Sequence, residues 1–221
     1  MCIQNKSFVV YKEVFTFNPF QENTYLLWDD EGNGIIFDPG CHNYEERKII
    51  TEFIESKRIL LKYCLNTHAH IDHVMGVHYI KEHFKVPFAL HPKDLPLLND
   101  AANRAAVYGF PAFQAVEVDR FLVDNEIIEI GDMKLKVLFV PGHAPGHVAF
   151  YLEEQGWLID GDVLFRRSIG RTDFPLCNHA DLVNSIQNEL YVLPEETEVF
   201  PGHGGSTTIG IEKIQNPFVR A

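Results

Sequence analysis

The sequence predicts a mixed α/β (α+β) fold, with layers of β-sheet covered by helices. Three observations point to it. The chain of 221 residues is 46% hydrophobic, which is enough to bury a substantial core. Strands of alternating polarity open the chain, whereas later strands are interspersed with amphipathic helical segments. Prolines and glycines are scattered, with no linker, repeat or low-complexity tract, so we expect residues 1–221 to form a single domain.

The first strands are expected to form an antiparallel meander. Residues 8–17 alternate apolar and polar side chains, and residues 23–28 resume the pattern after a turn, which is typical of adjacent antiparallel strands. Residues 29–34 contain Asp, Glu, Gly and Asn, which favour a turn. Residues 35–38 then form the next strand, which ends at a Pro-Gly pair.

Helices are expected to follow this meander and to cover one face of the sheet. Isoleucine and phenylalanine recur at helical spacing across residues 43–56, with Asn43 as the expected N-cap. Residues 59–65 are short, apolar and partly β-branched, as a buried strand requires. Valine and isoleucine recur at helical spacing in the next segment, which predicts a second helix ending near Phe84.

The most informative stretch of the chain follows the buried strand. It places His68, His70, Asp72 and His73 within six residues. Imidazole nitrogen and carboxylate oxygen are good donors to divalent ions, and alternation puts His68 and His70 on one side of an extended chain. Asp72 and His73 are displaced in register and can serve a second ion. The alternative is a solvated polar loop before a helix, with Asp72 as its cap.

Further candidate ligands lie at the ends of later strands. A predicted hairpin at residues 126–140 leads to His143, and a strand pair at residues 148–159 leads to Asp162. A helix is expected at residues 181–190, before a short strand that leads to His203, and another near Glu212. Because acidic groups at the end of an apolar strand are costly unless solvated, hydrogen-bonded or bound to a cation, these positions favour a metal site.

Residues 92–113 are expected to be irregular. They could form a connecting helix or a flap that places Tyr108 and Phe110 beside the site, and we favour the flap because long connections are often functional. Three other histidines have no ligand spacing to one another and are interpreted as surface or locally hydrogen-bonded residues: His78, His83 and His91.

Composition excludes several classes of protein. A formal net charge of -12 argues against a nucleic-acid surface, which needs clustered Lys and Arg. No apolar run has the length of a membrane span, and the N-terminus lacks an apolar signal-peptide core, so a cytoplasmic enzyme is expected. The four cysteines form no Cys-x-x-Cys pair, which favours reduced, mostly inert thiols.

Several motifs together resemble one family. They are residues 18–25 (NPFQENTY), 38–40 (DPG), 161–165 (GDVLF), 168–175 (SIGRTDFP) and 207–213 (TTIGIEK), together with the ligand-bearing strand ends. In order and spacing they are similar to the metallo-β-lactamase superfamily, and within it to short bacterial hydrolases of the glyoxalase II (hydroxyacylglutathione hydrolase) type. The resemblance implies a four-layer αββα sandwich of two mixed β-sheets, with a dinuclear metal site along one edge.

The resemblance also implies a role for each candidate ligand. His68, His70 and His143 would hold the first metal, Asp72, His73 and His203 the second, and Asp162 would bridge them. The cofactors would be two divalent ions, with Zn as the first choice and Fe or Mn as alternatives. The Asp162 carboxylate is similar to the glyoxalase II, lactonase and persulfide dioxygenase branches and unlike the lactamases proper.

The expected activity is hydrolysis of a small thioester, S-2-hydroxyacylglutathione or a related acyl thiol. Two ions that share a water supply a bridging hydroxide as nucleophile, and Asp72 would orient it and carry its proton. The longer glyoxalase II enzymes grip glutathione with a C-terminal helical domain, and this chain stops soon after His203, so the carrier thiol stays open. The alternatives are a mononuclear iron persulfide dioxygenase and a non-enzymatic metal-binding domain.

Other polar residues near these motifs have less distinct roles. His147 could orient the ligand loop or make a plain structural hydrogen bond. Arg171 and Asp173 are expected to form a buried pair that shapes the site, although Arg171 could instead meet a substrate carboxylate. Ser168 and Ser206 are interpreted as loop residues, because the chain has no Gly-x-Ser-x-Gly elbow.

Overall fold

The computed structural model describes residues 9–220, which form two six-stranded sheets. The first sheet has the order β1 (Val10–Phe17), β2 (Glu22–Asp29), β3 (Asn33–Phe37), β4 (Leu60–Leu65), β5 (Phe88–Leu90) and β6 (Arg120–Phe121). The second has the order β14 (Thr207–Thr208), β13 (Glu198–Pro201), β10 (Trp157–Gly161), β9 (Val148–Leu152), β8 (Met133–Phe139) and β7 (Ile127–Ile130). A small separate hairpin joins β11 (Leu164–Phe165) to β12 (Ser168–Ile169).

Both sheets are mixed, as expected. The meander β1–β2–β3 is antiparallel and continues into the parallel strands β4, β5 and β6. In the second sheet β7 to β10 run antiparallel, β10 pairs with β13 in parallel, and β14 closes the edge antiparallel. Since the parallel neighbours β10 and β13 end at the same edge, the polar residues that follow them are brought together there.

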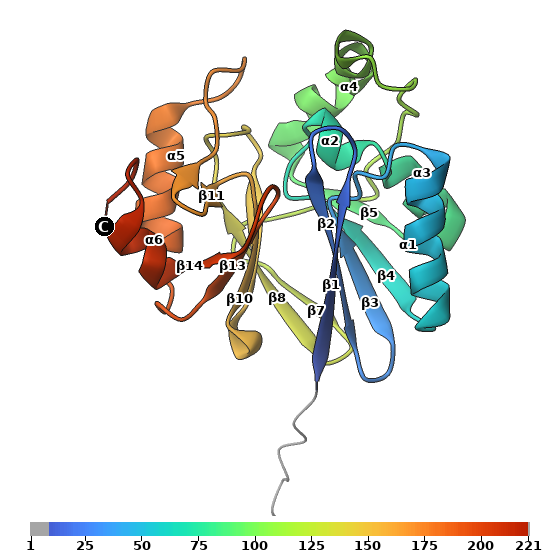
Figure 1. Ribbon diagram of the computed structural model, residues 1–221, viewed down its shortest axis with the longest axis horizontal. Helices are drawn as coiled ribbons and strands as arrows, with labels where there is room; N and C mark the ends of the chain where they lie inside the picture. The colour runs from blue at the N-terminus through green and yellow to red at the C-terminus, as the bar shows by residue number, and fades with distance from the viewer. Residues whose placement is uncertain (1–8, 221) are drawn as a thin grey trace, which may run out of the picture.

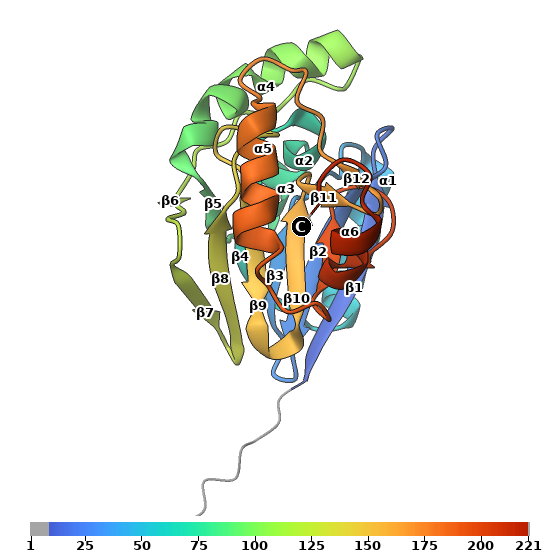
Figure 2. The same ribbon diagram turned by 90° about the vertical axis from the view of Figure 1, so that its left-hand side faces the viewer.

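Four layers build the molecule. The two sheets lie face to face in the middle, with α1 (Tyr44–Ser56) and α3 (Val77–Phe84) outside the first sheet and α5 (His179–Ser185) and α6 (Ile209–Gln215) outside the second (Figure 1). The view at 90° places α5 across the outer face of the second sheet and α4 (Leu95–Tyr108) above the edge (Figure 2). This is the predicted αββα sandwich.

The core between the sheets is apolar and draws on both of them. Ile35 and Phe37 from β3 pack with Val137 from β8 and Phe150 from β9, and the rings of Phe37 and Phe150 lie 5.1 Å apart. Two further buried clusters fill the spaces under α1 and α3 and under α5. Burial of these side chains is the main favourable term that holds the sheets together.

The first helix forms for the local reasons that the sequence predicted. Asn43 caps it, since its side chain accepts a hydrogen bond from the amide of Glu46 at 2.9 Å. Acidic residues occupy the first turn, where they complement the helix dipole, and Ile50 and Ile54 are buried toward the sheet.

Three helical predictions need correction. Residues 92–113 are not irregular throughout: a 3₁₀ turn (Pro92–Asp94) leads into α4, which is the connecting-helix alternative, because Leu98, Ala101 and Ala105 share one buried face, and only residues 109–113 are irregular. The helix predicted to reach Phe84 is split into α2 (Ile71–Val74) and α3. The helix predicted at residues 181–190 begins earlier, at His179, and its last turn is a π-helix, η3 (Ile186–Leu190).

The cysteines and the lengths of the helices bear on the class of protein to which the chain belongs. Cys41, Cys64 and Cys177 are free thiols, and burial raises the pKa of Cys41 to about 12. Their inertness stays a prediction. Cys2 and the start of the first predicted strand lie outside the described residues. Within residues 9–220, no helix has the length and apolar character that crossing a membrane requires.

Candidate metal centre

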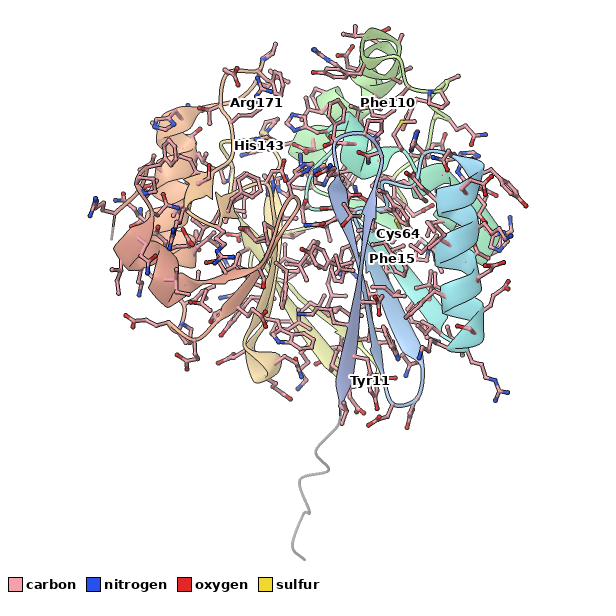
Figure 3. The ribbon with its side chains drawn as sticks, viewed as in Figure 1. Tyr11, Phe15, Cys64, Phe110, His143 and Arg171 are labelled. Atoms are coloured by element: carbon pink, nitrogen blue, oxygen red, sulfur yellow. The ribbon has the colours of Figure 1, made fainter. Side chains whose placement is uncertain are left out.

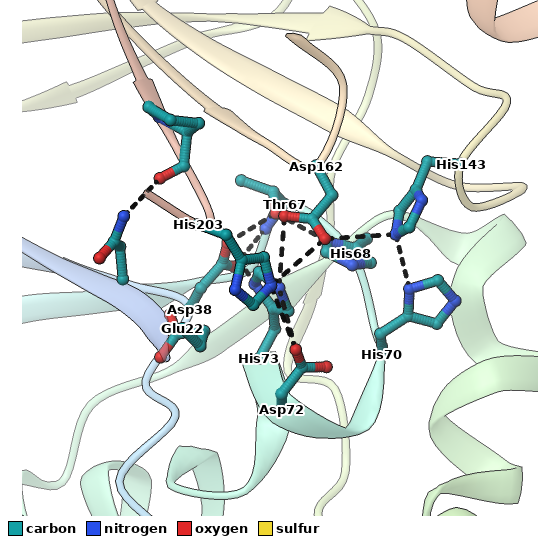
Figure 4. Close-up of polar contacts among 12 residues, drawn as sticks. Glu22, Asp38, Thr67, His68, His70, Asp72, His73, His143, Asp162 and His203 are labelled. Atoms are coloured by element: carbon teal, nitrogen blue, oxygen red, sulfur yellow. Dashed lines mark hydrogen bonds and ion pairs between the residues drawn. The ribbon is translucent and has the colours of Figure 1, made fainter. Parts of the chain in front are cut away.

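All the predicted ligands meet at one edge of the sandwich. His68, His70, Asp72 and His73 lie on the loop after β4 and on α2, whereas His143, Asp162 and His203 follow strands of the second sheet, and Figure 4 shows the seven side chains facing one another. Three groups of side chains have their ligand atoms within 4.8 Å of one another; two contain predicted ligands alone, and the third adds Asp38 to His68 and His73. We call His68, His70 and His143 the first triad, and Asp72, His73 and His203 the second triad.

The first triad is formed by imidazoles from both sheets. His68 is fully buried, and Nδ1 of His70 lies 2.8 Å from Nε2 of His143. Burial, together with neighbouring imidazoles, lowers the pKa of His70 to about 3 and that of His68 well below its ordinary range. The first triad therefore offers neutral nitrogens, which is the form in which histidine binds a metal ion.

Asp162 connects the two triads. Its Oδ1 lies 3.6 Å from Nε2 of His73, and its Oδ2 lies 3.5 Å from Nε2 of both His143 and His203. In the second triad, Oδ2 of Asp72 lies 3.3 Å from Nε2 of His203 and 3.8 Å from Nε2 of His73. One carboxylate thus faces nitrogens of both triads, which is the geometry of a bridging ligand.

Unpartnered atoms show that this donor set fits metal ions. His68 Nε2, His73 Nε2 and Asp162 Oδ1 are buried and have no hydrogen-bond partner among residues 9–220. Buried polar atoms normally have a partner, because leaving one without it costs about 1–3 kcal/mol. All three point into the space between the triads, where divalent cations would satisfy them (Figure 4).

Partners on the far side of each ring fix its orientation. Nδ1 of His143 lies 2.8 Å from the carbonyl oxygen of Arg171, and Nδ1 of His203 lies 3.1 Å from that of Phe20. A carbonyl oxygen only accepts, so each Nδ1 carries a proton, and Nε2, once it is deprotonated, directs its lone pair toward the centre. Hydrogen bonds of this kind orient metal-binding histidines and raise their basicity.

Asp38 is a functional residue that sequence reasoning left without a role. It is buried at the end of β3 and accepts hydrogen bonds from the amide and the hydroxyl of Thr67, at 2.7 and 2.6 Å. Its Oδ2 also lies 3.2 Å from Nδ1 of His73, and Oγ1 of Thr67 lies 3.0 Å from Nδ1 of His68. Asp38 therefore supports one ring of each triad. In the sequence, the position of Asp38 at the end of a predicted strand and before a Pro-Gly pair could have indicated this role.

Replacing Asp38 with asparagine should weaken binding of the second ion about 10- to 100-fold, because the amide group cannot accept from His73 and Thr67 as the carboxylate does. Chelator competition with Zn²⁺ measures the change. Asp29→Asn is the matched control, since Asp29 is a buried carboxylate that accepts amide hydrogen bonds at the far end of β2. Equal losses of affinity in both variants would contradict the role of Asp38.

His203 of the second triad and the neighbouring Asp162 carry opposite charges in the metal-free protein. Burial lowers the pKa of His203, but hydrogen bonds to Asp162 and Asp72 outweigh it and raise the pKa to about 10. Burial raises the pKa of Asp162, but the facing His73 and His203 outweigh it and hold the pKa well below its usual range. Metal binding must therefore displace the proton of His203, so metal affinity should fall as the pH is lowered.

The pKa of His203 predicts how the stability of the chelator-treated protein depends on pH. Because the folded pKa is about 10 and the ordinary value is 6.5, protonated His203 stabilises the fold fully below pH 6.5, and this contribution is lost as the pH rises through 10. The melting temperature should fall across this window, and more steeply than in His203→Asn. A variant with the same slope as the wild type would contradict the prediction.

Other predicted site residues lie around the triads. Nε2 of His147 accepts the amide of Asp162 at 3.1 Å, and its ring stacks on that of His68 at 4.6 Å, which supports the orienting role over a plain structural one. Nδ1 of His91 accepts from the amide of Lys93, which is the local contact that was expected, whereas His78 bonds to the carbonyl oxygen of Ala115, 37 residues away.

The predicted pair of Arg171 and Asp173 forms, but the expectation that it is buried is wrong. Two hydrogen bonds of 2.7 Å join the side chains, which are 57% and 67% exposed. The guanidinium therefore stays at the rim of the site and packs on the ring of Phe174 at 3.9 Å. Figure 3 shows Arg171 and His143 on one side of the edge and Phe110 on the other.

A cavity of about 420 Å³ opens onto the triads. His70, Asp72, His143, Asp162 and His203 lie at its base. Its walls include the apolar and cationic residues Phe20, Leu97, Arg104, Tyr108, Phe165, Ile169, Arg171 and Phe174. Tyr108 therefore lies beside the site as the flap hypothesis required, although it does so from the end of a helix, whereas Phe110 packs on Phe20 at 5.3 Å.

Comparisons with known proteins agree with this geometry. A family model for the metallo-β-lactamase superfamily matches residues 17–203. The chain is 38% identical over 211 residues to a protein of Haemophilus influenzae named hydroxyacylglutathione hydrolase GloC, covering 95% of this chain and 98% of that protein.

Two solved structures are also similar. BLEG-1 B3 metallo-β-lactamase is 35% identical with a TM-score of 0.88, over 96% of this chain and all of that one. TTHA1623, solved in a di-iron-bound form, is 40% identical with a TM-score of 0.83, over 94% of this chain and all of that one. The chain therefore belongs to the metallo-β-lactamase superfamily and carries the His and Asp groups of a metal-dependent hydrolase.

Proposed function

We propose that this protein hydrolyses a small thioester, S-2-hydroxyacylglutathione or a related acyl thiol, at a dinuclear metal centre. The observation that carries the proposal is the pair of triads that share Asp162 at the base of the cavity. The name of the GloC relative, which covers almost the whole chain, supports the substrate class. The di-iron form of TTHA1623 supports two ions.

The proposed ligands are those of the two triads together with the bridging Asp162. Imidazole and carboxylate suit zinc, iron and manganese alike, so we propose zinc as the first choice and keep iron and manganese as alternatives. Because the ligands come from both sheets, we propose that one domain carries the whole centre. When bound, two divalent ions would polarise the substrate carbonyl and lower the pKa of a water molecule toward neutrality.

The residues of the chain account for the remaining steps. The side chain of Asp72 is 14% exposed and lines the cavity, so its carboxylate can hold the proton that the attacking water loses. The water oxygen bonds to the acyl carbon, the carbon–sulfur bond breaks, and the proton passes to the departing thiolate. The products are a carboxylic acid and a free thiol. The apolar walls, among them Phe20, Leu97 and Phe174, hold the acyl thiol and exclude bulk water.

One test combines metal analysis with a thioester panel. Protein purified without chelator should contain two ions per chain. After reconstitution with Zn²⁺, Fe²⁺ or Mn²⁺, it should hydrolyse S-lactoylglutathione or another thioester of the panel, and the carrier thiol is varied to find the preferred one. A β-lactam serves as the comparison substrate. Absence of turnover with every thioester would overturn the proposal.

The runner-up function is a mononuclear iron persulfide dioxygenase, which would use the first triad alone. The fully assembled second triad and its contact with Asp162 favour the dinuclear hydrolase. One iron per chain, oxygen uptake with a persulfide and no hydrolysis would support the dioxygenase instead. A purely structural metal site is disfavoured, because the triads open onto a cavity, whereas structural sites are closed.

A further inference from the structure

A buried carboxylate outside both triads connects their two loops. Asp94 is completely buried and lies at the junction of the 3₁₀ turn and α4. Its Oδ2 accepts the amide of Ala69 at 2.7 Å, and its Oδ1 accepts the amide of Gly146 at 2.5 Å. Ala69 lies between His68 and His70, and Gly146 lies three residues after His143. Each oxygen thus holds one of the two backbone segments that carry the first triad.

The position of Asp94 shows that its carboxylate serves these loops rather than its own helix. Asp94 occupies the N-cap position of α4, where aspartate commonly accepts from an amide of the first turn, yet it makes no such bond. A carboxylate is costly to bury unless hydrogen bonds compensate, and here amides from two other parts of the fold do so.

Close packing at Gly146 shows how tightly the second loop sits on Asp94. A Cβ added at Gly146 would lie 2.5 Å from the backbone nitrogen of Asp94 and 2.7 Å from its Oδ1, well inside van der Waals contact. Any larger residue would push the loop away. The same two loops meet where Nδ1 of His70 lies 2.8 Å from Nε2 of His143 (Figure 4).

We infer that Asp94 is a positioning residue that clamps the His68–His70 loop of the first sheet to the His143 loop of the second, and so sets the spacing of the first triad. The inference rests on the metal site proposed above. Metal ions bind tightly only where their ligands are already held at the right separation. Loss of the clamp should therefore lower the affinity for the first ion in particular.

The decisive variant is Asp94→Asn, which keeps the volume and one acceptor oxygen but turns an NH₂ group toward one of the amides. The affinity for the first ion should fall about 10- to 100-fold, whereas the affinity for the second ion should change much less. Zn²⁺ titration with chelator competition measures the affinities for both ions. Repeating the titration in the His203→Asn background, where the second triad is impaired, isolates the affinity for the first ion. Burial raises the pKa of Asp94 to about 7 against its amide hydrogen bonds, so the titrations are made at pH 8.

A second variant reaches the same clamp from the other side. Gly146→Ala leaves the carboxylate of Asp94 in place but forces a methyl group against it. This variant should show the same selective loss of affinity for the first ion. Asp119→Asn is the matched control. Asp119 also accepts a backbone amide, that of Phe88 at 2.8 Å, and pairs with Lys81, but it belongs to neither ligand loop.

Amide hydrogen exchange in metal-free protein tests the clamp without metal or activity. The amides of Ala69 and Gly146 should exchange at least about 10-fold faster in Asp94→Asn than in the wild type. One amide loses its hydrogen-bond acceptor, and the other lies on a loop that is no longer held to its partner. A variant that binds both ions like the wild type, with unchanged exchange, would overturn the clamp. Wild-type protein that binds no metal would overturn the proposed function instead, and the exchange data would then decide on the clamp.

Discussion

Replacing Asp162 with asparagine should lower kcat/KM by about 10³-fold or more, which corresponds to about 4 kcal/mol of transition-state stabilisation. Asp162 lies 3.5 to 3.6 Å from nitrogens of both triads, and these neighbours keep it ionised despite its burial. An asparagine cannot supply the negative charge that two bridged cations require. Steady-state kinetics on the best thioester, together with metal analysis, measure the effect, and both activity and metal content should fall.

Asp160→Asn is the matched control for this experiment. Asp160 is two residues away and fully buried, and burial raises its pKa well above the usual range, which favours the neutral form and makes an amide a close substitute. It accepts the amide of Leu164 at 2.8 Å and does not face the triads. Activity near the wild-type level is expected. A comparable loss in both variants would show that the loop, and not the bridging charge, is responsible.

Asp72→Asn should lower kcat by about 10²- to 10⁴-fold while KM changes little, since general acid–base catalysis contributes effects of this size. Asp72 faces the cavity, and its Oδ2 lies 3.3 Å from Nε2 of His203. The substitution leaves the backbone carbonyl oxygen of Asp72 bonded to Asn18, so the loop should keep its shape. The measurement is kcat and KM against pH at saturating metal, where the acidic limb of the profile should be lost.

Metal supplementation separates the two roles of Asp72. If excess Zn²⁺ restores activity to Asp72→Asn, the side chain acts as a ligand only, and its proposed part in proton transfer is wrong. Asp173→Asn provides the comparison, because Asp173 is an exposed carboxylate that pairs with Arg171 and belongs to neither triad. Its kcat should stay near that of the wild type.

Local patterns determined most of the secondary structure. The helix with its cap at Asn43 and the strand before His68 were predictable, because capping and strand propensity act within a few residues along the chain. The prediction that this whole strand is buried is wrong, since only Cys64 and Leu65 at its end are buried. The segment at residues 92–113 was not predictable. Its alanines contribute little to a helical pattern of hydrophobicity. The helix α4 is stabilised because Leu98, Ala101 and Ala105 pack into the apolar core.

The sequence by itself determined which side chains to expect at the candidate centre, because each candidate ligand follows an apolar strand and the cluster from His68 to His73 is compact enough to recognise. Only the tertiary structure decided how close those side chains come. His143, Asp162 and His203 reach the cluster because the two sheets pack face to face and the parallel strands β10 and β13 end at one edge.

The supporting carboxylates belong to the same class of unpredictable features. Asp38 and Asp94 accept hydrogen bonds from residues that lie 29 and 52 positions away in the chain. The exposure of the Arg171 side chain likewise depends on whether a distant part of the chain packs over it. The spacing of residues along the chain does not predict such contacts. They arise only when burial of the apolar faces brings distant loops together, and that packing is what turns a set of recognisable ligands into a metal centre.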